Sequence, residues 1–218
     1  MTKTQNMKAR NIALILIPLN IILAYYIYDN INSQITFNKD AKERIAENVQ
    51  KLKDLRQLQI KYKQAKGEFS DDFDKLTYFL QNEQIPIVRA TGETPDSLIN
   101  GQQISDELAL ELGLISRDTT YVLAKESVFD AAYIESRKNR FPLNIDMLET
   151  VPYTDVEYNV DAGQIEKGNV IVQVFEISTN YKTVFTGLDA KNKSYELDAI
   201  LKVGSMTEAS LNGNWKNE

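Results

Sequence analysis

The sequence contains no cysteine and no histidine in 218 residues. Without cysteine the chain has no disulfide, no thiolate nucleophile, no cysteine ligand for an iron–sulfur cluster and no lipoprotein anchor. Without histidine it has no Ser–His–Asp triad, no histidine ligand for zinc and no imidazole to titrate near neutral pH. The phosphate-binding pattern G-x-x-x-x-G-K and the dinucleotide-binding pattern G-x-G-x-x-G are missing as well. These absences exclude most enzyme classes, and we predict a protein without catalytic residues, cofactor or metal ion.

Basic side chains are scarce in the second part of the chain. From Gly67 to the C-terminus there are thirteen basic and twenty-six acidic side chains. Such an acidic domain is unsuited to nucleic acid, which is bound by basic surfaces. Residues 39–66 are opposite in sign, with nine basic and four acidic side chains. This excess could contact anionic lipid or an acidic partner, or form a solvated face that balances the acidic domain.

Glycine and proline are also sparse, and neither occurs between Ile31 and Lys66. The stretch is rich in Lys, Glu, Gln, Leu and Ile, so residues 32–66 are predicted to form a helical stalk. Apolar residues recur in it at intervals of three and four, which places them on one face of the helix. They are Ile45, Val49, Leu52, Leu55, Leu58 and Tyr62. This stripe predicts either a coiled coil, through which the protein associates with itself or with other chains, or packing on its own domain.

One long hydrophobic run lies near the N-terminus. No charged residue occurs in the eighteen residues from Asn11 to Tyr28, and such a helix extends about 27 Å, enough to cross the hydrocarbon core of a bilayer. Three tyrosines at its end are typical of the aromatic belt of membrane proteins, and the basic residues before it favour a cytoplasmic N-terminus. We therefore predict a cytoplasmic tail over residues 1–10 and a transmembrane helix over residues 11–31.

A cleavable signal peptide has a similar outline. It needs small residues at the cleavage site, however, and the bulky Tyr25 and Tyr26 follow Ala24 directly, so an uncleaved anchor is favoured. Pro18 and Asn20 lie in the middle of the run. An unpaired amide is costly in lipid, so these two residues predict association with a neighbouring membrane helix. The alternative is a tolerated proline and an amide without a partner.

Residues 67–218 are predicted to form an extracytoplasmic α+β domain with a mainly antiparallel sheet. Gly67 ends the stalk, and Ser70 is expected to cap a helix whose first turn holds three Asp. These carboxylates could hold Ca²⁺, but a calcium loop needs a glycine turn and further oxygen ligands, so capping is favoured. Ser105 is expected to cap a helix over residues 106–112. Predicted strands cover residues 85–89, 119–124, 156–160, 170–177 and 196–203, with a turn at residues 161–163.

A small basic cluster stands out in this acidic domain. It consists of Arg137, Lys138 and Arg140. The cluster could bind an anionic ligand or the acidic surface of a partner, because opposite charges steer association. The alternative is a solvated loop.

The long helix is expected to end, and the head to begin, in a stretch that contains four notable residues. They are Tyr62, Gly67, the aromatic Phe69 shortly after it, and Leu76. In this order they resemble the end of the long helix in pilin-like proteins, over the nineteen residues from 58 to 76. The N-terminus lacks the Gly–Phe pair and the fifth-position Glu of true pilins, so polymerisation as a pilus subunit is not implied. The layout of basic tail, single span, stalk and small head is similar to inner-membrane assembly proteins of type II secretion and type IV pilus systems, and to single-span proteins of envelope motors.

These features together predict a location and a class of function. We expect a single-pass protein of the bacterial inner membrane, with its C-terminal domain in the periplasm. Its expected function is that of a non-enzymatic scaffold subunit in an envelope assembly, with the membrane and other envelope proteins as partners. The alternative is a membrane-tethered sensor or ligand-binding module, whose domain of about 150 residues is large enough to hold a pocket.

Overall fold

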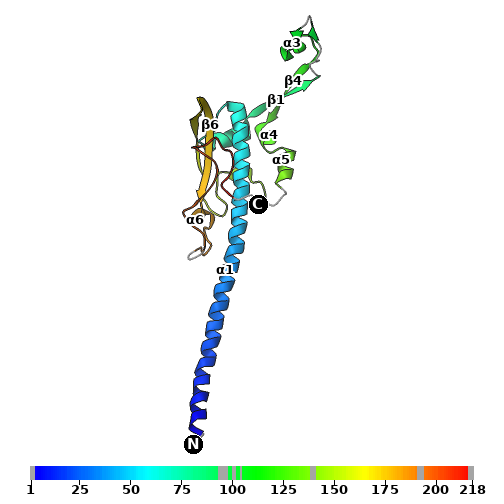
Figure 1. The fold of residues 1–218 in the computed structure, drawn as a ribbon. Helices are drawn as coiled ribbons and strands as arrows, with labels where there is room; N and C mark the ends of the chain where they lie inside the picture. The colour runs from blue at the N-terminus through cyan, green and yellow to red at the C-terminus, as the bar shows by residue number, and fades with distance from the viewer. Residues whose placement is uncertain are drawn as a thin grey trace.

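The computed structural model describes residues 3–92, 98–99, 102–103, 105–137, 141–190 and 194–215. The architecture is α+β, as predicted: a long N-terminal helix, a head built around the second half of that helix, and a narrow arm that projects from the head (Figure 1). The first helix, α1, runs without interruption from Lys3 to Lys66 and contains Pro18. It ends at Gly67, which has a φ of 87° and donates its N–H to the carbonyl of Lys63 at 2.8 Å. A positive φ favours glycine, so the predicted end of the helix is confirmed.

The first part of α1 is exposed and apolar. Large apolar side chains from Ile12 to Ile35 all lie open to the surroundings. An 18-residue window in this part has a mean hydropathy of 1.8, and none of it is buried within the protein. By length and composition this helix can cross a membrane.

The second part of α1 is the central element of the head. The six residues of the predicted stripe are buried or half-buried in the main hydrophobic core of the same chain. Other faces of the helix are buried as well, at Ala46, Asn48, Asp54 and Gln59. Residues from Phe37 onward, which the sequence assigned to a separate stalk, therefore belong to the core of the head. The stripe packs on the protein's own domain and leaves no free seam for a coiled coil at these positions.

A three-stranded antiparallel sheet covers one side of α1 (Figure 1). Its strands lie in the order β5 (Asn159–Lys167), β6 (Val170–Asn180) and β7 (Ile200–Gly204). The predicted turn at residues 161–163 is wrong, because Gly163 pairs with Val174 inside the β5–β6 ladder. The chain reverses at Gly168 and Asn169, whose φ angles of 57° and 65° suit a tight two-residue hairpin.

Short helices pack near α1 on the other side. Helix α2 (Phe73–Asn82) buries Leu76, Phe79 and Leu80, as its pattern predicts. Its N-cap is Asp72 rather than the predicted Ser70. Helices α4 (Ala124–Val128) and α5 (Ala131–Ser136) lie on this side as well (Figure 1). The remaining short elements are the 3₁₀ turn η1 (Ile145–Met147) and α6 (Tyr181–Val184), which directly follows β6 on the sheet side. Helices α4, α5 and α6 were not predicted, because four to six residues are too few to display a helical period.

The arm is a two-stranded antiparallel ribbon. Strand β1 (Gln84–Thr91) pairs with β4 (Ser116–Leu123) over eight positions, from Gln84 opposite Leu123 to Thr91 opposite Ser116. Its far end carries the short strands and helix β2 (Leu98–Ile99), β3 (Gln102–Gln103) and α3 (Asp106–Glu111). Helix α3 is capped by the Ser105 hydroxyl, which accepts the N–H of Leu108 at 3.2 Å, as predicted. Figure 1 shows the arm leaving the head beyond the end of α1, away from the N-terminus.

Candidate functional site

The ribbon of the arm exposes both backbone edges and many side chains. No third strand pairs with β1 or β4 among the described residues. All of β4 is exposed except the half-buried Val122. Tyr121 is 64 % exposed and Leu123 is 43 % exposed. A two-stranded ribbon is marginally stable by itself and its open edges can pair with another chain, so this arm is suited to binding a partner.

The tip of the arm has a small core of its own and an apolar outer face. Ala109 and Ile115 are buried against each other. Gly92 has a φ of 102°, and a Cβ there would lie 2.5 Å from the carbonyl oxygen of Leu114, so the strand end packs closely on the tip. Outside this core, Leu108, Leu110, Leu112 and Leu114 remain exposed. Exposed apolar patches mark protein–protein interaction sites, and four exposed leucines within seven residues make the tip a candidate for such a site.

The tip is also acidic. Asp106, Glu107 and Glu111 lie on α3. The guanidinium of Arg117 is 4.0 Å from the Asp106 carboxylate, with both side chains largely exposed. We use the term arm tip for residues 105–117. The arm tip thus combines apolar side chains with an excess of negative charge.

A mostly apolar groove of about 340 Å³ lies beside the last turns of α1. Its walls come from α1, the start of β6 and the C-terminal segment. Its lining residues include Ile60, Lys63, Phe69, Val172, Val174 and Leu211. The Lys63 ammonium lies 4.6 Å from the centre of the Phe69 ring, and the Arg56 guanidinium donates to the carbonyl of Leu211 at 3.4 Å. We call this the distal groove; it is apolar inside and basic at its rim.

A second pocket of about 240 Å³ lies between the middle of α1 and the segment from Phe141 to Thr154. We call it the polar pocket because charged side chains of α1 are among its lining residues. Lys51 donates to the carbonyl of Thr150. Burial lowers the pKa of Lys51, and the carboxylates of Glu149 and Glu47 partly oppose this shift. The polar pocket therefore contains a lysine whose charge is less favoured than in water.

Asp54 and Arg137 form a buried ion pair in the wall of the polar pocket. Their side chains are only 3 % and 5 % exposed, and the closest N–O distance is 2.9 Å. The pair is bidentate, because Arg137 Nε and Nη2 donate to the two carboxylate oxygens of Asp54. The hydroxyl of Tyr133 donates to the same carboxylate at 2.8 Å. Burial, then the Asp54 charge, raises the pKa of Tyr133.

This arrangement changes the interpretation of the predicted basic cluster. The sequence predicted that Arg137, with Lys138 and Arg140, could bind an anion or an acidic partner. Arg137 is instead buried and neutralised by Asp54, and its Nη1 donates to the carbonyl of Phe141 at 3.0 Å. Lys138 and Arg140 lie outside the described residues. The prediction is thus wrong for Arg137, because its charge is already neutralised by Asp54, an acid from a distant part of the chain.

Pro18 and Asn20 lie on the exposed part of α1. The helix continues through Pro18. The Asn20 amide donates to the carbonyl of Leu16 at 2.9 Å, one turn earlier in the same helix. This bond satisfies one N–H of the amide inside its own helix. The predicted association with another membrane helix stays a prediction. It would use the remaining polar atoms of the Asn20 side chain.

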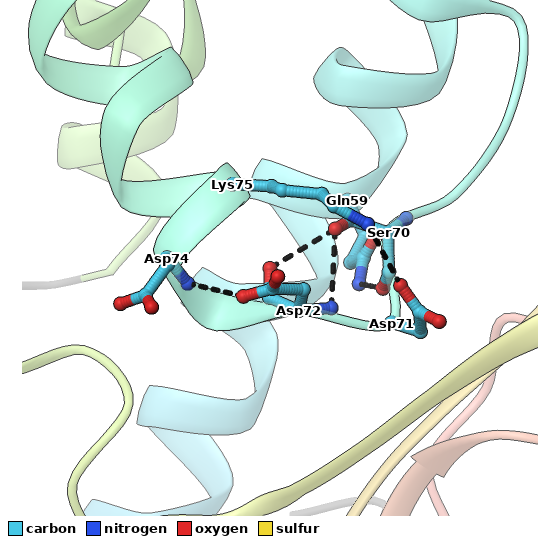
Figure 2. A network of polar contacts seen from close by, with 6 residues as sticks. All are labelled: Gln59, Ser70, Asp71, Asp72, Asp74 and Lys75. Atoms are coloured by element: carbon cyan, nitrogen blue, oxygen red, sulfur yellow. Dashed lines mark hydrogen bonds and ion pairs between the residues drawn. The ribbon is translucent and has the colours of Figure 1, made fainter.

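A buried amide joins the end of α1 to the start of α2 (Figure 2). Gln59, which is fully buried, donates to the carbonyl of Ser70 at 2.7 Å and accepts the N–H of Ser70 at 3.0 Å. The Ser70 hydroxyl in turn accepts the N–H of Asp72, whose carboxylate accepts the N–H of Asp74 at 2.8 Å. Asp71 pairs with Lys75 at 3.3 Å on the surface. Asp72 therefore caps α2, Asp71 pairs with Lys75, and Asp74 is the acidic residue of the first turn.

We expect the substitution Gln59→Met to lower the free energy of unfolding by about 2–3 kcal/mol, because it leaves two backbone groups of Ser70 without partners in a buried site. Urea unfolding of the full-length protein in mild detergent, followed by circular dichroism, measures this loss. The matched control is Gln64→Met, at an exposed position of the same helix. Equal stability of the two variants would contradict the proposed role of the amide.

The sequence signalled some of these features and concealed others. Four leucines within residues 108–114 are visible in the sequence. Their exposure is not, since a spacing of two residues does not by itself indicate whether the side chains are buried. Asp54 and Gln59 appear in sequence as members of a solvated helix face, and only the fold shows that they are buried. A comparison with protein-family models, with curated proteins and with solved structures finds no match to this chain.

Proposed function

We propose that this chain is a non-enzymatic scaffold subunit of a bacterial envelope assembly of secretion, pilus or motility type. In this proposal the N-terminus lies in the cytoplasm of a bacterial cell, α1 spans the inner membrane, and the head lies in the periplasm. The positive charges before the apolar run support this orientation.

The observation that carries the proposal is the arm. It projects from the head, exposes leucines at its tip and leaves both edges of its ribbon unpaired among the described residues. Ordering such an element has an entropic cost, which contacts with a partner can offset. An interaction subunit needs this kind of surface.

The continuity of α1 supports the same function. From Tyr28 at the end of the uncharged run to Lys66, the helix is unbroken and spans roughly 57 Å at 1.5 Å per residue. The core of the head is packed directly around the second half of this helix. Membrane anchor and head are therefore connected without a flexible linker, which suits a protein that holds a binding surface at a set height above a membrane.

Binding of a small ligand, the second candidate, is favoured by the polar pocket. Most charged groups there already have partners within the chain: Asp54 with Arg137, and Lys51 with the carbonyl of Thr150. A ligand would have to compete with these contacts. A partner that binds the exposed leucines of the arm tip would not have to displace such contacts, so we favour the scaffold function.

The test is a double substitution of the arm tip, Leu108→Ser together with Leu112→Ser. Both side chains are exposed, so we expect the free energy of unfolding to change by less than about 1 kcal/mol, while partner proteins are lost. The full-length protein and the variant are purified from native membranes in mild detergent, and the eluates are compared by quantitative mass spectrometry. The control is Val156→Ser, at a 52 % exposed position of the head. Retention of the same partners by the arm-tip variant would contradict the proposed function of the arm.

A further inference from the structure

We propose that the arm tip of one copy of this protein docks into the distal groove of a second copy. This inference rests on the proposed function, because it names the partner of the arm. Two surfaces of the same chain carry it: an acidic tip with exposed leucines, and an apolar groove with a basic rim.

The apolar parts of the two surfaces fit each other in kind and size. Leu108 lies inside α3 and Leu112 is its C-cap, four residues further on, so the two leucines lie on the same side of the helix. They are 38 % and 51 % exposed. The distal groove, of about 340 Å³, is of the size that commonly binds small apolar groups. Insertion of these leucines would cover Ile60, Val172 and Leu211 as well as the leucines themselves.

The charged parts of the two surfaces are opposite in sign. The arm tip has three carboxylates and one cation, Arg117. The rim of the groove has Lys63, which extends over Phe69, and Arg56, which extends to the carbonyl of Leu211. Two acids stand directly before lining residues in the sequence, Glu68 before Phe69 and Glu208 before Ala209, whereas Lys63 and Arg56 make direct contacts with groove residues. Opposite charges around an apolar centre favour one docking orientation over others.

The arrangement of the two surfaces favours docking between copies. Figure 1 shows the arm leaving the head on the opposite side of α1 from β6, which forms a wall of the groove. Each copy therefore offers one tip and one groove in different directions. Contacts between unlike surfaces continue from copy to copy into a ring or a row. Anchoring in one membrane raises the effective concentration of the copies, so a small contact is sufficient. Because the arm tip lies beyond the end of α1 and the groove lies beside its last turns, the docked neighbours are inclined to each other.

The absence of cysteine permits a direct test by disulfide cross-linking of the full-length protein. Two differently tagged forms, one with Leu112→Cys and one with Leu211→Cys, are co-expressed in the same membrane and oxidised. We expect a disulfide between the two tagged forms. The control replaces Leu211→Cys by Val156→Cys, at an exposed position outside the groove, and we expect a clearly weaker cross-link there.

Charge reversal provides the second measurement. We expect Lys63→Glu in the groove form to reduce the cross-linked fraction by about two- to fivefold. Adding Glu107→Lys and Glu111→Lys to the tip form should restore it, which a merely damaged groove would not permit. The proposal is overturned if the Leu112–Leu211 pair cross-links no more than the control pair. If the Leu108→Ser, Leu112→Ser variant still loses other envelope proteins in that case, the arm is an interaction site but its partner is not a second copy.

Discussion

Replacement of Arg137 by methionine is expected to lower the free energy of unfolding by about 3–5 kcal/mol, the range for a buried ion pair that loses one partner. The substitution leaves the Asp54 carboxylate, which is 3 % exposed, without its bidentate guanidinium. The hydroxyl of Tyr133 and the amide of Gln50 still donate to Asp54, but they bring no opposite charge. Urea unfolding of the full-length protein in mild detergent, followed by the fluorescence of Trp215, measures the change; this tryptophan packs against the core.

The double variant Asp54→Leu, Arg137→Met separates the cost of an unpaired charge from the worth of the pair. We expect it to be more stable than Arg137→Met alone, since neither charge is then buried. Recovery should be partial, because the hydroxyl of Tyr133 loses its acceptor. The control is Lys75→Met, which breaks the exposed pair with Asp71 and should leave stability unchanged within error. A small effect of Arg137→Met, similar to this control, would show that the pair is not buried in solution.

Replacement of Leu55 by alanine is the second large effect that we expect. Leu55 is fully buried at the centre of the head, so the free energy of unfolding should fall by about 2–5 kcal/mol. The matched control is Ile35→Ala in the same helix, where the side chain is 62 % exposed and outside the core. Its effect should be below about 1 kcal/mol.

The concentration dependence of the Leu55→Ala effect distinguishes two uses of the stripe. Because Leu55 packs within its own chain, the loss of stability should be the same at low and high protein concentration. A coiled coil between chains would instead make the loss depend on concentration, since association contributes to stability by mass action. Urea unfolding at protein concentrations that differ tenfold decides between them. A loss that shrinks as the concentration rises would restore the coiled-coil interpretation.

Features with local causes were predictable. The long helix follows from a stretch without glycine or proline, and its end from Gly67. The cap of α3 at Ser105 and the strand β6 were also read correctly, because their patterns are short and strong. Where two local signals competed, the prediction failed. Asp161 to Gly163 favours a turn, yet pairing with β6 holds these residues in a strand. Ser70 and Asp72 are both good caps, and Ser70 is instead used by Gln59 and the N–H of Asp72.

The candidate site was less predictable than the fold. Its leucines are visible in the sequence, but their exposure depends on what the rest of the chain leaves uncovered. The distal groove joins three segments that are distant in sequence, and no local pattern marks it. The amphipathic stripe was visible, yet whether it would meet another chain or its own head could not be deduced from spacing alone.

The sequence by itself determined the elements that depend on neighbouring residues: one helix apolar enough to cross a membrane, a helical continuation, and a mixed acidic head. Only the tertiary structure decided which surfaces remain free. It wraps the head around the stripe, buries Arg137 against Asp54 across 83 positions, and leaves the arm outside. The physical reason is that the burial of a side chain depends on segments far away along the chain, whereas helix propensity and hydropathy depend on residues close by.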